Sequence, residues 1–129
     1  DVHHTAGPQN QPVKEIERFH IKVRGWPAIG YSYLVDARGN IYEGRGPNVK
    51  GAHSPPVNDQ PSVALIGLYS IIAPSKAQRA AVWDLLDHIN AGQLRGHRDS
   101  FPTSCPGDAA YQSVVLRGRP KVTKPQPEW

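Results

Sequence analysis

The sequence predicts a single α/β domain in which a mixed central β-sheet of about five strands is flanked by about three helices. The chain has 129 residues and a mass of 14.2 kDa, the size of one ordinary domain. Segments typical of strands, with alternating or continuous apolar residues, are interspersed with segments in which apolar residues recur at helical spacing. Their order along the chain is β-α-β-β-β-α-β-α, which indicates a mixed sheet with helices packed against it.

The N-terminal part of the chain is expected to contain a strand followed by a helix. Residues 1–5 are predicted to be a strand because Gly7 and Pro8 interrupt the chain directly afterwards. The helix is predicted to start at Pro12, which suits a first helical turn, and to end before Gly25. Its apolar residues recur mostly at helical spacing: Val13, Ile16, Phe19, Ile21 and Val23.

A hairpin and a buried strand are predicted in the middle of the chain. In residues 31–35, Tyr31, Tyr33 and Val35 alternate with Ser32 and Leu34, as in a strand. Residues 37–40 have the composition of a turn, and residues 41–43 supply the returning strand. Residues 62–72 are an almost unbroken apolar run, so we expect a strand that is buried on both faces at the centre of the sheet.

The C-terminal part is predicted to contain two helices separated by a short strand. Ser75 and Gln78 form the pattern of a capping box, and apolar residues follow at helical spacing until Gly92. Residues 93–96 are predicted to be the short strand. The last helix is predicted to open at residues 106–108 and to continue through Tyr111, Val114 and Val115.

The distribution of charge argues against nucleic-acid binding. The net charge is +4, but +3 of it falls in residues 117–129, so residues 1–116 are nearly neutral and lack a basic stripe. The sequence contains neither an apolar run of about 18 residues nor a signal-peptide pattern, so we expect no membrane insertion, and the localisation stays open. We expect one domain over residues 1–117 and a proline-rich basic tail or linker over residues 118–129.

The spacing of His97 and Cys105 makes them a candidate pair of metal ligands. Seven residues rich in turn formers separate them, and such a loop can bring both side chains onto one ion. Cys105 is the only cysteine, so it is a small buried hydrophobe, a metal ligand or a nucleophile. Its place before the last helix is expected to favour the thiolate. Since neighbouring side chains of a strand point to opposite faces, only one of His3 and His4 can join such a site.

Five segments of the chain, in the same order, resemble the type 2 N-acetylmuramoyl-L-alanine amidases. This zinc family includes phage lysins and the peptidoglycan recognition proteins. Each segment is weakly specific alone, but the five together, with the eight-residue interval from histidine to cysteine, are highly specific. The segments are Val2-His3-His4-Thr5-Ala6, residues 24–33 (RGWPAIGYSY), residues 39–45 (GNIYEGR), Gly51-Ala52-His53 and residues 96–107 (GHRDSFPTSCPG).

The resemblance implies a peptidoglycan recognition protein-like fold and a Zn²⁺ site. The family's three zinc ligands correspond to His3, His97 and Cys105, which leaves His4 as a structural residue. A structural zinc module is the weaker interpretation, because it would need a fourth protein ligand.

The resemblance also implies which residues act on the substrate. The catalytic tyrosine corresponds to Tyr31, whereas Tyr33, expected on the same face of the strand, is more typical of a core residue. Thr103 stands where the family has a residue that contacts the reacting carbonyl, and His53 corresponds to a substrate-binding residue of the groove. Residues 62–67 lack the acidic residue that some of these amidases carry there.

The implied activity is hydrolysis of the amide bond between N-acetylmuramic acid and L-alanine in bacterial peptidoglycan, as in a bacteriolytic endolysin. The expected partners are muramyl peptides, and the chain is expected to be a monomer or one module of a larger lytic protein. The alternative is a peptidoglycan-binding module without catalysis. The complete set of ligand residues favours the enzyme, because binding-only members typically lack one of them.

Overall fold

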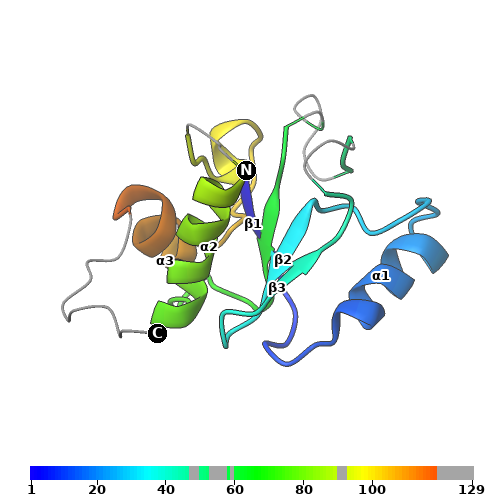
Figure 1. The fold of residues 1–129 in the computed structure, drawn as a ribbon, viewed down its shortest axis with the longest axis horizontal. Coiled ribbons are helices and arrows are strands. Elements are labelled where there is room, and N and C mark those ends of the chain that lie inside the picture. Colours follow the sequence, from blue (N-terminus) through cyan, green and yellow to red (C-terminus); the bar gives the residue numbers. More distant parts are fainter. Residues whose placement is uncertain (47–49, 53–57, 59, 90–92, 119–129) are drawn as a thin grey trace.

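A computed structural model describes residues 1–46, 50–52, 58, 60–89 and 93–118 of the chain. Within these residues four short strands form one sheet, and three α-helices lie beside it (Figure 1). The elements, in order, are β1 (Val2–His4), α1 (Val13–Lys22), β2 (Tyr33–Val35), β3 (Ile41–Glu43), β4 (Val63–Leu65), α2 (Lys76–His88), the 3-10 turn η1 (His97–Asp99), α3 (Asp108–Ala110) and its π-helical continuation η2 (Tyr111–Leu116).

The sheet has the order β1-β4-β2-β3 and is mixed, as predicted. Strands β1, β4 and β2 run parallel, whereas β3 pairs antiparallel with β2 in the expected hairpin. The strand predicted from the long apolar run, β4, lies inside the sheet between β1 and β2. The fold class is therefore confirmed, with four strands in place of about five.

The fifth strand, predicted at residues 93–96, is reduced to a single bridge. The N–H group of Val2 donates to the Arg95 carbonyl over 2.7 Å, and Gly96 is the only residue of this segment that bridges to Val2. After Gly96 the chain turns into η1, where the Asp99 carboxylate accepts the N–H group of Gly96 over 2.9 Å.

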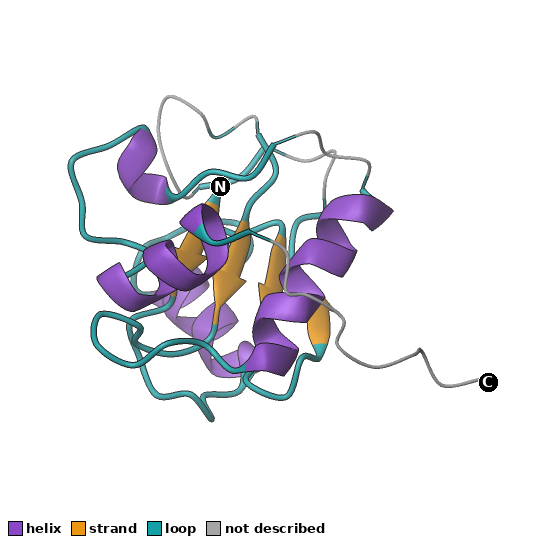
Figure 2. Cartoon of the chain, turned by 90° about the vertical axis from the view of Figure 1, so that its left-hand side faces the viewer, coloured by secondary structure: helices purple, strands orange, loops and turns teal. Residues whose placement is uncertain are grey.

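Helices cover both faces of the sheet, and each face has its own hydrophobic cluster (Figures 1 and 2). On one face, side chains of β1, β2 and β4 pack against α2 and against Ala110 and Val114 of the last helix. On the other face, Leu34 and Ala64 pack against Ile16 of α1. Among the described helices, none is both long and apolar enough to cross a membrane.

Helix α1 begins and ends close to the predicted limits but buries a narrower face than its pattern suggests. Pro12 is the N-cap residue, and the inward-facing side chains are Ile16 and His20. Three of the apolar residues that gave the helical pattern are exposed: Phe19, Ile21 and Val23. The buried face of the helix therefore includes a histidine that was not part of the predicted apolar pattern.

The predicted strand at residues 62–72 was too long. Strand β4 ends at Leu65, and the chain turns away at Gly67, whose φ of +141° few residues other than glycine adopt. Ile71 and Ile72 then lie in the following loop and are 92% and 66% exposed. An apolar run alone cannot distinguish such an exposed loop from a buried strand.

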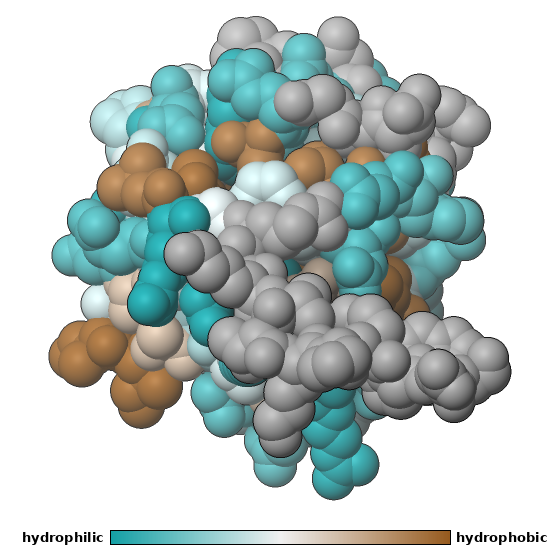
Figure 3. Space-filling model, turned by 60° about the vertical axis from the view of Figure 1, so that its left-hand side comes forward, coloured by the Kyte–Doolittle hydropathy of each residue, from teal (hydrophilic) through white to brown (hydrophobic). Residues whose placement is uncertain are grey.

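Viewed from the side of Figure 3, hydrophobic groups form separate patches on a mostly hydrophilic surface.

The capping box predicted for α2 is only half formed. The Ser75 hydroxyl oxygen accepts the N–H group of Gln78 over 3.0 Å, as expected. The Gln78 side chain, however, turns into the core, where its Nε2 donates to the Val35 carbonyl over 2.9 Å and its Oε1 accepts the Tyr69 hydroxyl over 2.8 Å. Gln78 thus joins α2 to β2 instead of capping the helix.

Candidate active site

The structure brings His3, His97 and Cys105 together beside β1. Their potential ligand atoms all lie within 4.8 Å of one another. Cys105 Sγ lies 3.7 Å from His3 Nδ1, and the rings of His3 and His97 are 4.5 Å apart. Residues 102 positions apart in the sequence therefore meet at one point.

Strand β1 separates the two neighbouring histidines. His3 faces the cluster, whereas the His4 Nδ1 accepts the backbone N–H group of Tyr69 over 3.2 Å. Burial, with a smaller contribution from Arg98, lowers the pKa of His4. Its ring is thus a buried, hydrogen-bonded part of the fold, which is the position that the alternation of a strand predicts.

The loop from His97 to Gly107 folds back on itself and places Cys105 next to His97. The N–H group of Arg98 donates to the Cys105 carbonyl over 3.1 Å. The Cys105 N–H group donates to the Thr103 hydroxyl oxygen over 3.2 Å, and the Gly107 N–H group donates to the Ser104 carbonyl over 2.7 Å. These bonds close the loop without using the Cys105 side chain.

The cluster has the chemistry of a zinc site. Two imidazoles and a thiol are the nitrogen and sulfur donors that Zn²⁺ prefers, and three protein ligands leave one coordination position open, as in catalytic zinc sites. The His97 Nδ1 atom is buried and has no hydrogen-bond partner within the described part of the chain. A buried nitrogen of this kind is costly to leave unpaired, so a cation at this position would satisfy it.

Without a cation, the thiol form of Cys105 is favoured. Burial raises its pKa to about 11, although the backbone N–H group of His4 and the charge of Arg98 act in the opposite direction. The expectation that the last helix favours the thiolate was therefore wrong for the metal-free protein. The helix begins at Asp108, three residues beyond Cys105, and burial outweighs its dipole.

Tyr31 lies beside the cluster, with its ring centre 5.4 Å from that of His3. Burial, together with the nearby Cys105, raises the pKa of Tyr31 to about 12, so its hydroxyl is a hydrogen-bond donor at neutral pH. Contrary to the prediction, Tyr33 does not lie on the same face of the sheet as Tyr31. It packs in the hydrophobic cluster between the sheet and α2. The two differ because β2 begins only at Tyr33, so the alternation does not extend back to Tyr31.

Thr103 is also near the cluster. Its hydroxyl oxygen accepts the Cys105 N–H group, and a hydroxyl that accepts one bond can still donate its own hydrogen. The remaining predicted site residue, His53, lies outside the described residues.

His20 is a buried histidine near the site that the sequence analysis missed. Its Nδ1 accepts the N–H group of Gly30 over 2.8 Å, and its ring lies 4.8 Å from Trp26 and 5.6 Å from Tyr31. Burial, with smaller contributions from Arg24 and Arg45, lowers its pKa to about 4. The available signal was its spacing of four residues from Ile16, which puts both on one face of α1.

His20 and Tyr31 also line a cavity of about 410 Å³ next to the cluster. Arg24 and Trp26 lie along its wall, with the guanidinium 5.4 Å from the Trp26 ring. The cavity gives a substrate a surface of aromatic rings and hydrogen-bonding groups beside the candidate ligands.

The sequence model of the N-acetylmuramoyl-L-alanine amidase family matches residues 1–108. The chain belongs to this family. The match covers β1 and the whole loop that carries His97 and Cys105.

Individual relatives are amidases and peptidoglycan recognition proteins. The N-acetylmuramoyl-L-alanine amidase of Sus scrofa is 38% identical over 138 residues, which cover 93% of this chain and 23% of the relative. Peptidoglycan-recognition protein SC2 of Drosophila simulans is 35% identical over 128 residues, covering 88% of this chain and 70% of the relative. The chain thus spans about a quarter of the mammalian amidases that it matches and about two thirds of the insect proteins.

Solved structures of the same family share the fold. Human PGRP-IBETAC, in complex with glycosamyl muramyl pentapeptide, superposes with a TM-score of 0.78 at 31% identity. The superposition covers 88% of this chain and 78% of that one. The family model and the relatives place the chain among amidases and peptidoglycan recognition proteins, and the solved structures are peptidoglycan recognition proteins.

Proposed function

We propose that this domain is a zinc-dependent N-acetylmuramoyl-L-alanine amidase that cleaves the bond between N-acetylmuramic acid and L-alanine in bacterial peptidoglycan. The main support for this proposal is that the potential ligand atoms of His3, His97 and Cys105 lie within 4.8 Å of one another. Two residues with hydroxyl groups, Tyr31 and Thr103, lie next to them. A binding module has no need of three convergent metal ligands together with hydrogen-bond donors around an open coordination position.

The three ligand residues would hold the cation from two parts of the fold. His3 is fixed by the pairing of β1 with β4, and the other two ligands are fixed by the closed loop 97–107. Zn²⁺ bound here would supply a Lewis acid that polarises the substrate carbonyl and makes water a nucleophile at neutral pH. Since the Cys105 thiol is protonated in the metal-free protein, binding should release a proton.

Tyr31 and Thr103 are proposed to donate hydrogen bonds to the oxygen of the reacting carbonyl. Both are neutral donors, and a donor in place before the reaction stabilises the negative charge that develops in the transition state. The burial of Tyr31 strengthens this effect because little water competes for its hydroxyl.

Muramyl peptides are the proposed substrate class. A solved relative of the same fold holds a muramyl pentapeptide, and the cavity beside Tyr31 offers aromatic rings and the Arg24 guanidinium. His53 is proposed to contact the same substrate. The catalytic domain is proposed to comprise residues 1–117, with residues 118–129 as a tail or linker, which agrees with the family match over residues 1–108.

Digestion of purified peptidoglycan tests the proposal. Mass spectrometry of the products should show free L-alanine amino groups on the stem peptides and intact lactyl groups on the muramic acid. The chelator-treated protein is the control and should give no products. A zinc-loaded protein that binds peptidoglycan without releasing these products would instead be the binding module, as some peptidoglycan recognition proteins are.

A further inference from the structure

Tyr111, in the last helix, packs against the backbone on both sides of His97. Its hydroxyl donates to Asp99 Oδ1 over 2.6 Å, and its ring lies under the Arg98 guanidinium at 4.6 Å. The ring also lies against Gly96, where an added Cβ would come within 2.7 Å of it. Tyr111 thus contacts the residue before His97 and the two residues after it.

The partners of Tyr111 fix both ends of the loop that carries two of the three candidate ligands. At its start, the Oδ2 atom of Asp99 accepts the Gly96 N–H group over 2.9 Å, which closes the turn around His97. At its end, the Arg98 side chain donates to the Ser104 carbonyl and forms an ion pair of 2.9 Å with Asp108. Arg98 and Asp99 therefore connect the two ligand-bearing parts of the loop through the Tyr111 ring and hydroxyl.

The side chain of His97 makes ring contacts but leaves its Nδ1 unpaired within the described residues. Its ring lies 4.5 Å from that of His3 and stacks on Phe101, which is 47% exposed. The direction of the imidazole consequently depends on the backbone from Gly96 to Asp99, the segment that Tyr111 contacts.

We infer that Tyr111 is a positioning residue that sets the metal affinity of the His3–His97–Cys105 centre by holding His97 at its distance from Cys105. The inference rests on the proposed function, because it requires that the centre binds zinc. Groups that orient metal ligands without touching the ion typically change affinity by about 10- to 100-fold when they are removed.

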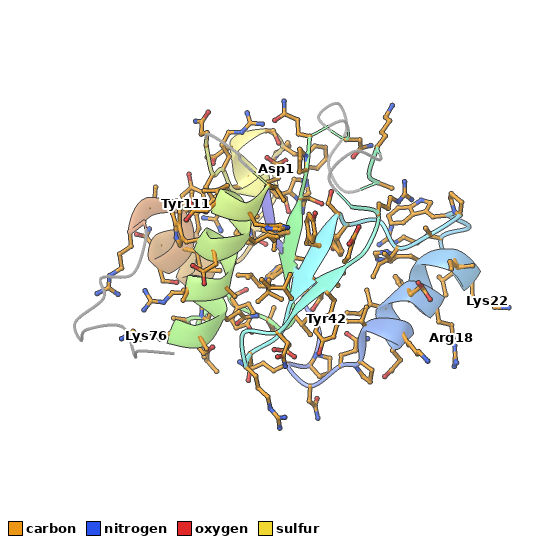
Figure 4. The ribbon with its side chains drawn as sticks, viewed as in Figure 1. Asp1, Arg18, Lys22, Tyr42, Lys76 and Tyr111 are labelled. Carbon is orange, nitrogen blue, oxygen red and sulfur yellow. The ribbon has the colours of Figure 1, made fainter. Side chains whose placement is uncertain are left out.

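The test compares the zinc affinity of Tyr111→Phe with that of the wild type by competition with a chromogenic chelator. The variant keeps the ring against Gly96 and Arg98 but loses the bond to Asp99, so we expect its Kd for zinc to rise about tenfold. The matched control is Tyr42→Phe, since Tyr42 also donates to a carboxylate, Asp36 Oδ2, over 2.9 Å. Figure 4 shows Tyr42 on β3, across the sheet from Tyr111, and its variant should keep the wild-type Kd.

Three further tests separate positioning from a loss of stability. The unfolding temperature of both metal-free variants should fall to a similar, small extent, whereas only Tyr111→Phe should weaken zinc binding. Asp99→Asn removes one acceptor of the same network while Tyr111 remains, and it should also raise the Kd. The thiolate-to-metal charge-transfer band of the Co²⁺-substituted protein should change in these two variants and not in Tyr42→Phe.

A Tyr111→Phe protein with a Kd within twofold of the wild type would overturn the inference, as would an equal loss of affinity in Tyr42→Phe. If the wild-type protein bound no zinc, the proposed metal centre would fall and the inference with it. A zinc-binding wild type with an unaffected Tyr111→Phe variant would overturn the inference alone.

Discussion

Cys105 is the residue on which the proposed metal centre depends most, because it alone brings a sulfur donor to the two imidazoles. Cys105→Ser replaces a potential thiolate by a neutral hydroxyl, so we expect the purified variant to lose stoichiometric zinc. Elemental analysis of the dialysed protein gives the zinc content directly. One zinc per chain in the variant would contradict the ligand assignment.

Tyr31 should contribute to turnover and not to metal binding. If its hydroxyl stabilises the developing oxyanion, Tyr31→Phe should lower kcat about a hundredfold while zinc content and unfolding temperature stay unchanged. Tyr33→Phe is the matched control, since Tyr33 is buried on the other face of the sheet and should retain its kcat. Equal activities of the two variants would make Tyr31 a packing residue.

His20 should make the stability of the metal-free domain depend on pH. Its pKa is lowered from 6.5 to about 4 in the folded protein, so below pH 6.5 the unfolded chain takes up a proton that the folded chain does not. The contribution of the neutral His20 side chain to the free energy of unfolding is fully present above pH 6.5. It is lost as the pH falls towards 4, by up to about 3 kcal/mol.

His20→Asn removes this titration, while the amide oxygen can still accept the Gly30 N–H group. Urea unfolding at several pH values should therefore give a smaller loss of unfolding free energy between pH 6.5 and 4 in the variant. Parallel curves for the two proteins would show that His20 does not carry this pH dependence.

Among the secondary-structure elements, the N-cap of α2 is the contact that the sequence predicts most directly. The Ser75 hydroxyl accepts from Gln78 and donates to the Ala37 carbonyl over 2.6 Å, so it also joins α2 to the β2–β3 turn. Ser75→Ala should lower the free energy of unfolding by about 1 kcal/mol, measured by chemical denaturation. The same replacement at the exposed Ser70 is the control, and an equal effect there would argue against the cap.

The sequence predicts the elements better than it predicts where they end. The hairpin and α2 follow from local turn and cap chemistry, which nearby residues determine alone. The end of β4 depends on the turn at Gly67, and the loss of a strand before His97 depends on the Asp99 carboxylate that accepts the Gly96 N–H group. Both features are local, but a pattern of apolar residues does not record them.

The same distinction applies to the candidate site. His3, His97 and Cys105 could be selected from the sequence because ligand chemistry and motif spacing identify them. His20 was missed, because its spacing from Ile16 indicates only a shared helix face and not its contacts with Gly30 and Tyr31. The direction of the Cys105 pKa was also missed, since burial is a property of the folded chain.

The proposed metal centre joins β1 to a loop about a hundred residues later. A bound cation would stabilise the fold by linkage, by about 2.7 kcal/mol at a free concentration one hundred times the Kd. Chelation should therefore lower the unfolding temperature of the wild type, measured by calorimetry. Cys105→Ser should unfold at the same temperature with or without chelator, and a drop in that variant would point to a metal site elsewhere.

The separation of 102 residues between His3 and Cys105 also bears on how the protein is made. Of the two paired strands β1 and β4, the ribosome releases β1 first, and β1 then waits for β4, which follows about 60 residues later. A nascent chain that ends before Cys105 has an incomplete donor set. A cell that synthesises this domain is therefore not exposed to the proposed activity of partly made chains, because the centre can assemble only when translation of residues 1–105 is finished.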